Sequence, residues 1–157
     1  GYDQVQEVLR LIREEPDSRR IIINLWNPTV LKDMCLPPCL FAYQFRVYGD
    51  KLSCAMVQRS GDMGLGVPFN ILSYSALTCL IAKHCSLEPY EFIYYLGNTH
   101  IYEEHVDSLK EQIKRTPFEF PKLNIKEVRE NIDDYELDDF VITDYKYHEK
   151  IKMKMNA

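Results

Sequence analysis

Two adjoining strand-like runs constrain the fold of this chain most. Residues 40–48 and 51–58 are rich in apolar, aromatic and β-branched side chains, and only Gly49 and Asp50 separate them. Such a short glycine-containing connection predicts an antiparallel hairpin. The two prolines before Cys39 force an extended approach to this hairpin. We therefore expect a β-ribbon that begins at a cysteine.

The remaining patterns predict helices and shorter strands around this hairpin. Apolar residues recur at helical spacing from Asp3, and residues 69–85 form a nearly continuous apolar helix after a glycine-rich loop at 59–68. Further strands are expected at 20–26, 90–102, 122–125 and 140–145, with polar residues 97–100 interrupting the second, and a further helix at 104–115. Without a repeat or a low-complexity linker, these elements predict one α+β domain over residues 1–157 with a mainly antiparallel or mixed sheet.

Composition narrows the possible partners. The chain has 157 residues and a formal net charge of −5, which argues against a protein that coats nucleic acid by general electrostatics. The apolar run 76–82 is too short to span a bilayer, and the first four residues do not resemble a secretory signal. We expect a soluble, cytoplasmic protein with no membrane partner and no specific nucleic acid partner.

The cysteines offer one candidate nucleophile. The chain has five cysteines and no Cys-x-x-Cys pair, so neither a disulfide framework nor a zinc knuckle is indicated. Cys39 follows a rigid Pro-Pro pair at the start of a strand, and Arg59 at the far end of the hairpin could favour its thiolate. The alternative for any cysteine is simple packing. We expect packing at Cys54, Cys79 and Cys85, and leave Cys35 unassigned.

Two groups of cations could bind an anion. Arg59 and Ser60, followed by Asp62 and a glycine-rich stretch, could cradle a phosphate, although a solvated turn is an equal alternative. Arg19 and Arg20 are adjacent, and adjacent strand residues face opposite ways. Both can reach one anion only if the chain is irregular there or a partner subunit supplies the anion; otherwise they are ordinary surface charges.

Three polar residues could bind a ligand with hydroxyl and amide groups. His100 and Tyr102 lie two apart on a predicted strand and could bind a sugar, or could form buried structural hydrogen bonds. Asn70, near the start of an apolar helix, could read the amide edge of a flat ring or could cap the helix. His84, His105 and His148 have no partners at metal-ligand spacing, so we predict no metal site.

Three motifs, in order and spacing, resemble the thymidylate synthase family. They are residues 36–39 (LPPC), 58–70 (QRSGDMGLGVPFN) and 97–102 (GNTHIY). Residues 19–22 (RRII), 26–27 (WN) and 151–153 (IKM) agree with the same family. The resemblance extends from end to end of this chain but covers roughly the last three-fifths of the family pattern.

The resemblance implies a thymidylate synthase fold, a mixed or antiparallel sheet packed with helices, that dimerises through the sheet. It also implies reductive methylation of deoxyuridylate (dUMP) to thymidylate (dTMP), with methylenetetrahydrofolate as cosubstrate, one-carbon donor and reductant, and with no metal. Cys39 would add covalently to carbon 6 of the uracil, which activates carbon 5.

The resemblance further assigns the site residues. Gln58, Arg59 and Ser60, with Arg19 and Arg20 from the opposite subunit, would bind the nucleotide, the arginines and Ser60 at its phosphate. Asn70 would read the uracil, and His100 with Tyr102 would bind the ribose. Asp62 would hold the pterin, and Leu65, Gly66, Phe69 and Asn156 would line the folate site, over which residues 155–157 would close.

Two departures and three alternatives accompany this assignment. Leu40 stands where the family usually has a histidine, and Arg46 replaces a common aromatic residue. Related deoxycytidylate hydroxymethylases carry an aspartate at the position of Asn70, so the amide favours uracil over cytosine. A non-catalytic nucleotide-binding or dimerising fragment is a further alternative, and some lineages fuse this enzyme to dihydrofolate reductase.

Overall fold

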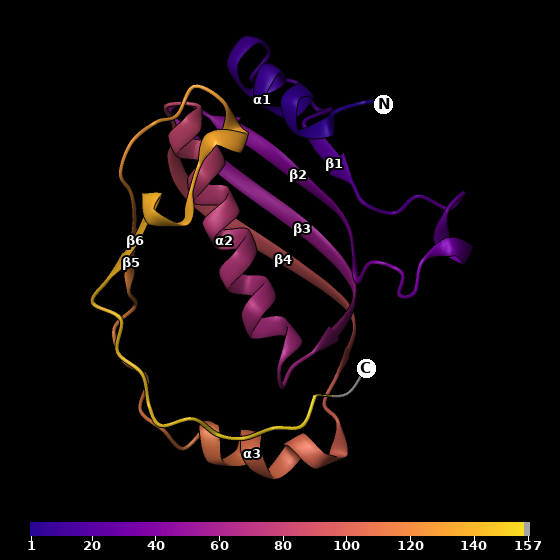
Figure 1. Ribbon diagram of the computed structural model, residues 1–157, viewed down its shortest axis with the longest axis vertical. Coiled ribbons are helices and arrows are strands. Elements are labelled where there is room, and N and C mark those ends of the chain that lie inside the picture. The colour runs from indigo at the N-terminus through magenta and orange to yellow at the C-terminus, as the bar shows by residue number, and fades with distance from the viewer. Residues whose placement is uncertain (156–157) are drawn as a thin grey trace.

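The computed structural model describes residues 1–155, which contain a four-stranded sheet in the order β1-β2-β3-β4 and a separate two-stranded sheet, β5-β6. Helix α2 lies across one face of the larger sheet (Figure 1). The α+β class and the mixed sheet that the sequence predicts are confirmed. No helix among these residues is long and apolar enough to cross a membrane.

Helix α1 (Gln4–Glu14) forms because its apolar residues repeat at helical spacing behind an N-terminal cap. The carboxylate of Asp3 accepts hydrogen bonds from the amides of Val5 and Gln6, each 3.0 Å long. Four residues on one face of the helix are buried: Val8, Leu9, Leu11 and Ile12. This face joins the main hydrophobic core.

Strands β2 (Leu40–Tyr48) and β3 (Lys51–Asp62) form the predicted antiparallel hairpin. Gly49 occupies the turn with a φ of 61°, which a glycine adopts without strain. Every second residue of β3 faces the core, from Leu52 to Gln58. Strand β1 (Ile22–Asn24) pairs with β2 and is shorter than the predicted run 20–26.

Strand β4 (Glu88–His100) pairs with β3 in parallel, and helix α2 (Gly66–His84) connects the two strands. A parallel pair needs such a crossover. As a result, the carboxyl ends of β3 and β4 meet at the edge of the sheet where α2 begins. The residue before β2, Cys39, reaches the same edge because β2 runs antiparallel to β3.

The structure corrects the predicted loop at 59–68 and the predicted break in β4. Strand β3 continues to Asp62 because its last residues pair with β4: Ser60 with Asn98, Gly61 with Thr99, and Asp62 with His100. The local glycine-rich sequence does not favour a strand, but pairing with the distant strand β4 gives its backbone groups hydrogen-bond partners. Helix α2 also begins three residues before the predicted position, at Gly66.

A 3₁₀ turn, η1 (Leu31–Asp33), lies between β1 and β2. After β4 the chain passes through short helices and the second sheet, in the order η2 (Glu103–His105), α3 (Val106–Gln112), β5 (Lys122–Ile125), η3 (Ile132–Asp134), η4 (Leu137–Asp139) and β6 (Phe140–Thr143). The segment after β6 runs back alongside the α3 region (Figure 1). Two hydrogen bonds attach it there, from Arg115 to the carbonyl oxygen of Glu149 and between His148 and the carbonyl oxygen of Thr116.

Candidate active site

Cys39 lies on a segment that Arg59 holds in place. The Arg59 backbone amide donates to the Cys39 carbonyl oxygen over 2.8 Å, while its guanidinium donates to the carbonyl oxygens of Pro38 and Pro37 over 2.9 and 2.8 Å. The guanidinium also lies over the Trp26 ring, 5.6 Å from its centroid. Three hydrogen bonds therefore fix the backbone that presents the partly exposed Cys39.

The other cysteines have different surroundings. Burial raises the pKa of Cys54 to about 11, against a weaker opposing effect of a hydrogen bond with Thr78. Burial also raises the pKa values of Cys79 and Cys85. These three side chains are therefore uncharged thiols at neutral pH, as expected for packing residues, and Cys35 is exposed.

Gln58 is the centre of a buried polar network beside this segment. Only 2% of Gln58 is exposed, and its amide nitrogen donates to the Ser60 carbonyl oxygen over 2.6 Å and to the Asn70 side-chain oxygen over 3.2 Å. The Tyr94 hydroxyl donates to the remaining Gln58 oxygen. The network thus fixes the orientation of Asn70, and leaves the Asn70 amide nitrogen to donate to a carbonyl oxygen of a ligand.

Tyr94 was not among the residues predicted from the sequence. It lies on the face of β4 that α2 covers, and the parallel register pairs it with Met56. Burial raises the pKa of Tyr94, and the neighbouring Cys39 and Tyr74 add to the effect. The sequence places Tyr94 two residues from Phe92, which predicts that both face the same side of a strand. It could not show which strand lies beside them.

Asp62 supports the start of α2. Its carboxylate accepts from the backbone amides of Gly64, Leu65 and Gly66 over 2.9, 3.3 and 3.4 Å. The three bonds close a turn that leads from β3 into the helix. Asn70 lies more than a turn inside the helix and therefore does not have the capping role that was the alternative for it.

Three aromatic rings extend the site from the end of β4. His100 packs edge-on against Tyr102, with centroids 5.3 Å apart, and Tyr102 packs against His105 at 5.5 Å. The backbone of Met63 donates to the His100 carbonyl oxygen over 3.0 Å, which ties this end of β4 to the Asp62 turn. His100 and Tyr102 remain neighbours although the strand ends at His100.

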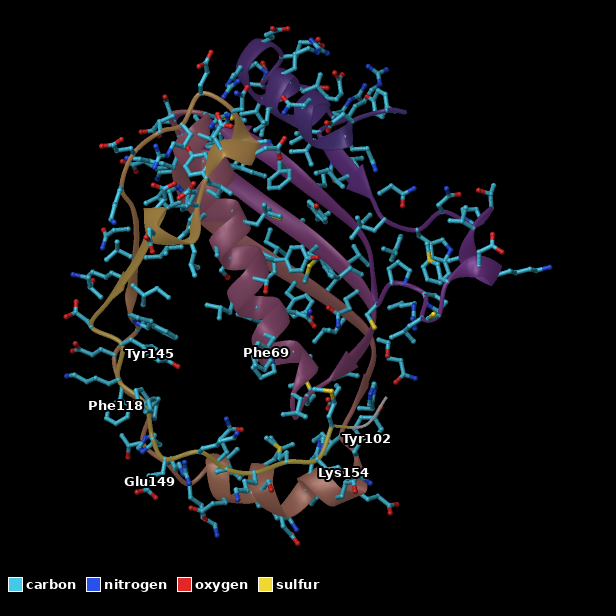
Figure 2. The ribbon with its side chains drawn as sticks, in the orientation of Figure 1. Phe69, Tyr102, Phe118, Tyr145, Glu149 and Lys154 are labelled. Atoms are coloured by element: carbon cyan, nitrogen blue, oxygen red, sulfur yellow. The ribbon has the colours of Figure 1, made fainter. Side chains whose placement is uncertain are left out.

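The residues expected at the folate pocket lie along the start of α2. Leu65 and Gly66 are partly buried, whereas 68% of Phe69 is exposed. Figure 2 shows Phe69 on the first turns of α2, with Tyr102 and Lys154 also toward this end of the molecule. Asn156, the remaining predicted residue, lies outside the described residues.

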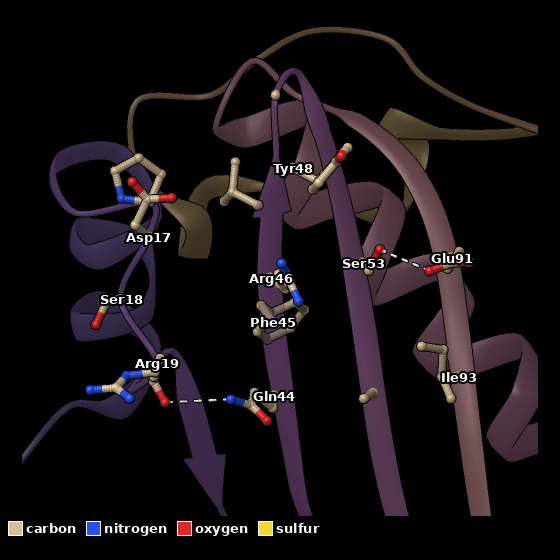
Figure 3. A pocket seen from close by; sticks show the side chains of 14 residues that line it. Asp17, Ser18, Arg19, Gln44, Phe45, Arg46, Tyr48, Ser53, Glu91 and Ile93 are labelled. Carbon is tan, nitrogen blue, oxygen red and sulfur yellow. Dashed lines mark hydrogen bonds between the residues drawn. The ribbon is translucent and has the colours of Figure 1, made fainter.

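Arg19 and Arg20 are not part of this cluster. Both are exposed, and Arg19 lines a hollow of about 740 Å³ against the open face of the sheet, together with Gln44, Arg46 and Tyr48 (Figure 3). The Gln44 side chain donates to the Arg19 carbonyl oxygen over 3.4 Å. Gln44 lies four strand positions beyond Leu40, or about 13 Å along β2 from the Cys39 end. Within residues 1–155, no group of His, Cys, Asp or Glu is arranged to hold a metal ion.

The whole chain, residues 1–157, matches the family model described as thymidylate synthase. The chain belongs to the thymidylate synthase family. It is 53% identical over 155 residues to a bifunctional dihydrofolate reductase-thymidylate synthase of Paramecium tetraurelia, covering 99% of this chain and 33% of that protein. It is 52% identical over 159 residues to thymidylate synthase 1/2 of Encephalitozoon cuniculi, covering 100% of this chain and 54% of that protein.

A putative bifunctional dihydrofolate reductase-thymidylate synthase of rice (Oryza sativa subsp. japonica) is 51% identical over 155 residues, with 99% of this chain and 31% of that protein covered. The chain thus spans about a third of the length of these two bifunctional relatives and about half the length of the Encephalitozoon protein. Leu40, where the resemblance leads us to expect a histidine, is partly buried and packs against the hydrophobic core. The unusual Arg46 is exposed on the open face of the sheet.

Proposed function

We propose that this chain forms a thymidylate synthase domain, lacking the N-terminal portion of the family, which converts dUMP to dTMP with methylenetetrahydrofolate as cosubstrate. The observation that carries the proposal is the placement of Cys39. Its segment is clamped by Arg59 and lies beside the buried Gln58, Asn70 and Tyr94 network. A nucleophile next to a fixed amide is the arrangement needed to attack a bound pyrimidine.

In this proposal, the Cys39 thiolate adds to carbon 6 of the uracil and leaves carbon 5 nucleophilic as part of an enolate. Carbon 5 then attacks the one-carbon unit. Methylenetetrahydrofolate supplies both that unit and the hydride that reduces it to a methyl group. Loss of the carbon 5 proton breaks the bond between the one-carbon unit and the folate nitrogen. Hydride transfer then oxidises the tetrahydrofolate to dihydrofolate, and elimination of Cys39 from carbon 6 restores the free thiolate.

The other residues bind and orient the reactants. Asn70, fixed by Gln58, reads the amide edge of uracil, while His100 and Tyr102 bind the ribose. Arg59 and Ser60 bind the phosphate, whose binding energy holds the ring against Cys39. Asp62 holds the pterin beside Leu65, Gly66 and Phe69, and Asn156 with the rest of the terminus closes over the ligands.

The proposed assembly is a dimer that buries the open face of the sheet. Arg19 and Arg20 are exposed beside this face, and Ile93 and Tyr95 expose apolar surface on it, 39% and 57% respectively. A symmetric dimer would carry both arginines of one subunit to the phosphate of the other. This supports an assembly in which each nucleotide site contains residues of both chains.

A covalent trap tests the catalytic proposal. The natural full-length polypeptide is mixed with 5-fluoro-deoxyuridylate and methylenetetrahydrofolate, and its intact mass is measured. Because fluorine at carbon 5 cannot leave as a proton does, a stable adduct on Cys39 is expected. Cys39→Ser should abolish the adduct, and Cys35→Ser, at an exposed cysteine of the same segment, should retain it. An adduct-free wild-type protein contradicts the catalytic proposal and favours the non-catalytic fragment.

A substrate comparison separates the two pyrimidine chemistries. With Asn70 in place, we expect turnover of deoxyuridylate and little of deoxycytidylate. Asn70→Asp should shift the preference toward cytosine, because a carboxyl group suits the cytosine edge. Preferred turnover of deoxycytidylate by the wild-type protein would instead identify a hydroxymethylase.

Mixing two inactive variants tests the shared site. Cys39→Ala and Arg19→Ala chains each lack one essential group, but half of the sites in a mixed dimer contain both groups intact. Random exchange of subunits should therefore restore up to about a quarter of the wild-type activity. No recovery after prolonged mixing would contradict the donation of Arg19 across the interface.

A further inference from the structure

His105 is a fully buried histidine with one satisfied and one unsatisfied nitrogen. Its exposed fraction is 0%, and its Nε2 lies 2.7 Å from the carbonyl oxygen of Lys154. Its Nδ1 has no hydrogen-bond partner. A buried polar atom without a partner is costly, so packing alone does not account for a histidine at this position.

The contact with Lys154 determines which nitrogen carries a hydrogen. A backbone carbonyl oxygen can only accept, so Nε2 must donate. The Nδ1 side of the ring faces the turn at the end of β3, where the Asp62 carboxylate lies 3.8 Å away. Gly64 lies directly over the ring, because a β-carbon at Gly64 would come within 2.5 Å of Nδ1.

His105 therefore connects two segments that are far apart in the sequence. One is the 62–66 turn, in which Asp62 supports the start of α2. The other is the C-terminal segment, which His105 holds at Lys154, a residue whose own side chain is exposed. Tyr102, packed on the ring of His105, places this connection beside the expected ribose site.

We propose that His105 is a positioning residue, which holds the C-terminal segment at Lys154 next to Asp62, where the folate is proposed to bind. This inference rests on the proposed function for the identity of the ligand. The tether itself rests on the hydrogen bond from Nε2 to Lys154. The Nε2 donor therefore performs the role. Because Gly64 has no side chain, the ring has the space to reach the carbonyl oxygen of Lys154.

Two conservative variants distinguish the effect of the Nε2 hydrogen-bond donor from the effect of the imidazole ring. The amide nitrogen of glutamine can occupy the place of Nε2, so His105→Gln should keep the tether. The shorter asparagine places its amide near Nδ1 and cannot reach Lys154, so His105→Asn should lose it. Gly64→Ala serves as a third variant, because its β-carbon would displace the ring while leaving His105 unchanged.

The first measurement is tryptic cleavage after Lys154 in the natural full-length protein without ligands, followed by mass spectrometry. His105→Asn and Gly64→Ala should increase the cleavage rate several-fold, whereas His105→Gln should stay near the wild-type rate. Melting temperatures identify any variant that fails to fold. If His105→Asn does not fold, the cleavage rate of Gly64→Ala tests the tether instead. Equal rates in His105→Asn, His105→Gln and the wild type would overturn the tether.

The second measurement is the KM of each substrate. His105→Asn should raise the KM for methylenetetrahydrofolate about fivefold, which corresponds to one lost hydrogen bond, and leave the KM for dUMP unchanged. His105→Gln should restore the wild-type value. A rise in both KM values, or equal effects of Asn and Gln, would overturn the positioning role. Absence of the fluorinated adduct in the wild type would overturn the proposed function, while the cleavage assay still decides on the tether.

Discussion

The two ends of helix α2 have opposite surroundings. At the carboxyl end, Ile81 and Ala82 are almost completely buried, with 1% and 0% exposed. Near the amino end, Phe69, Ile71 and Leu72 expose 68%, 45% and 59% of their surfaces. The same apolar sequence pattern thus produces a packed anchor at one end and an accessible apolar surface at the other.

The attachments of the two ends differ in the same way. At the carboxyl end, Arg13 of α1 donates to the His84 carbonyl oxygen over 3.1 Å, and the His84 side chain contacts the Tyr135 hydroxyl at 3.4 Å. At the amino end, the partners are the candidate site residues Asp62 and Gln58. The fold therefore concentrates its stability at one end of the helix and offers functional groups at the other.

The largest expected effect comes from a matched pair of isoleucines on α2. Ile81→Ala removes three buried carbons from the core and should lower the free energy of unfolding by about 2–5 kcal/mol. Ile71→Ala, on the accessible half of the same helix, should cost less than about 1 kcal/mol. Urea denaturation of both variants measures the difference. Equal losses would show that the two ends of α2 are equally packed.

A glycine at the site end supplies the second prediction. A β-carbon at Gly97 would lie 2.8 Å from the backbone carbonyl oxygen of Arg59, which has little freedom to move within β3. Gly97→Ala should force β3 and β4 apart beside Cys39 and cost about 1–3 kcal/mol of stability.

Gly66→Ala is the control for the stability cost alone, because its nearest contact, with the β-carbon of Asp62, is an ordinary 3.6 Å. Denaturation measures the cost, and the rate of adduct formation at Cys39 measures the distortion of the site. A Gly97→Ala protein with wild-type stability and adduct formation would show that the strand ends are pliable.

The elements predicted correctly are those whose signals are local. Helix α1, with its Asp3 cap, and the hairpin at Gly49 each depend on residues close together in the sequence. Strand β5 occupies residues 122–125, as predicted. Periodicity and turn chemistry were sufficient for these elements because no distant partner decides their geometry.

The features that were wrong or missed depend on distant partners. The end of β3 resembles a loop until it pairs with residues 98–100, and a parallel pairing leaves no short-range signal. Tyr94 contacts Gln58, and His105 contacts Lys154, across 36 and 49 positions of sequence. The family motifs identified most of the candidate site residues from the sequence. They could not show that Arg59 also donates hydrogen bonds to the backbone of Pro37 and Pro38.

The pH dependence of stability tests the buried end of α2. Burial lowers the pKa of His84, and the nearby Arg13 adds to the effect. Below the ordinary histidine pKa of about 6.5 the unfolded chain therefore binds a proton that the folded chain resists, so stability should fall as the pH decreases from 7 toward 5. His84→Gln should flatten this slope, measured by urea denaturation across the same range.

A second contact should also lose stability as the pH falls, but in a separate, more acidic pH range. The Arg129 side chain, with the backbone amide of Glu136, lowers the pKa of Asp139 below its ordinary value of 3.8. The stability that this carboxylate contributes should therefore be present above about pH 4 and lost as the pH falls further. Asp139→Asn should reduce the loss of stability below pH 4 while leaving the His84 slope unchanged. An altered slope between pH 7 and 5 in this variant would show that the two contacts are coupled.

The smallest effect on stability is expected at Phe69, and it sharpens the contrast between anchor and site. Because 68% of Phe69 is exposed, Phe69→Ala should change the free energy of unfolding by less than about 0.5 kcal/mol. The same variant should raise the KM for methylenetetrahydrofolate, since the ring is proposed to line the folate pocket. Phe120→Ala, at a ring that is 94% exposed, should alter neither quantity. A large loss of stability at Phe69 without a change in KM would assign this end of α2 to the structural core.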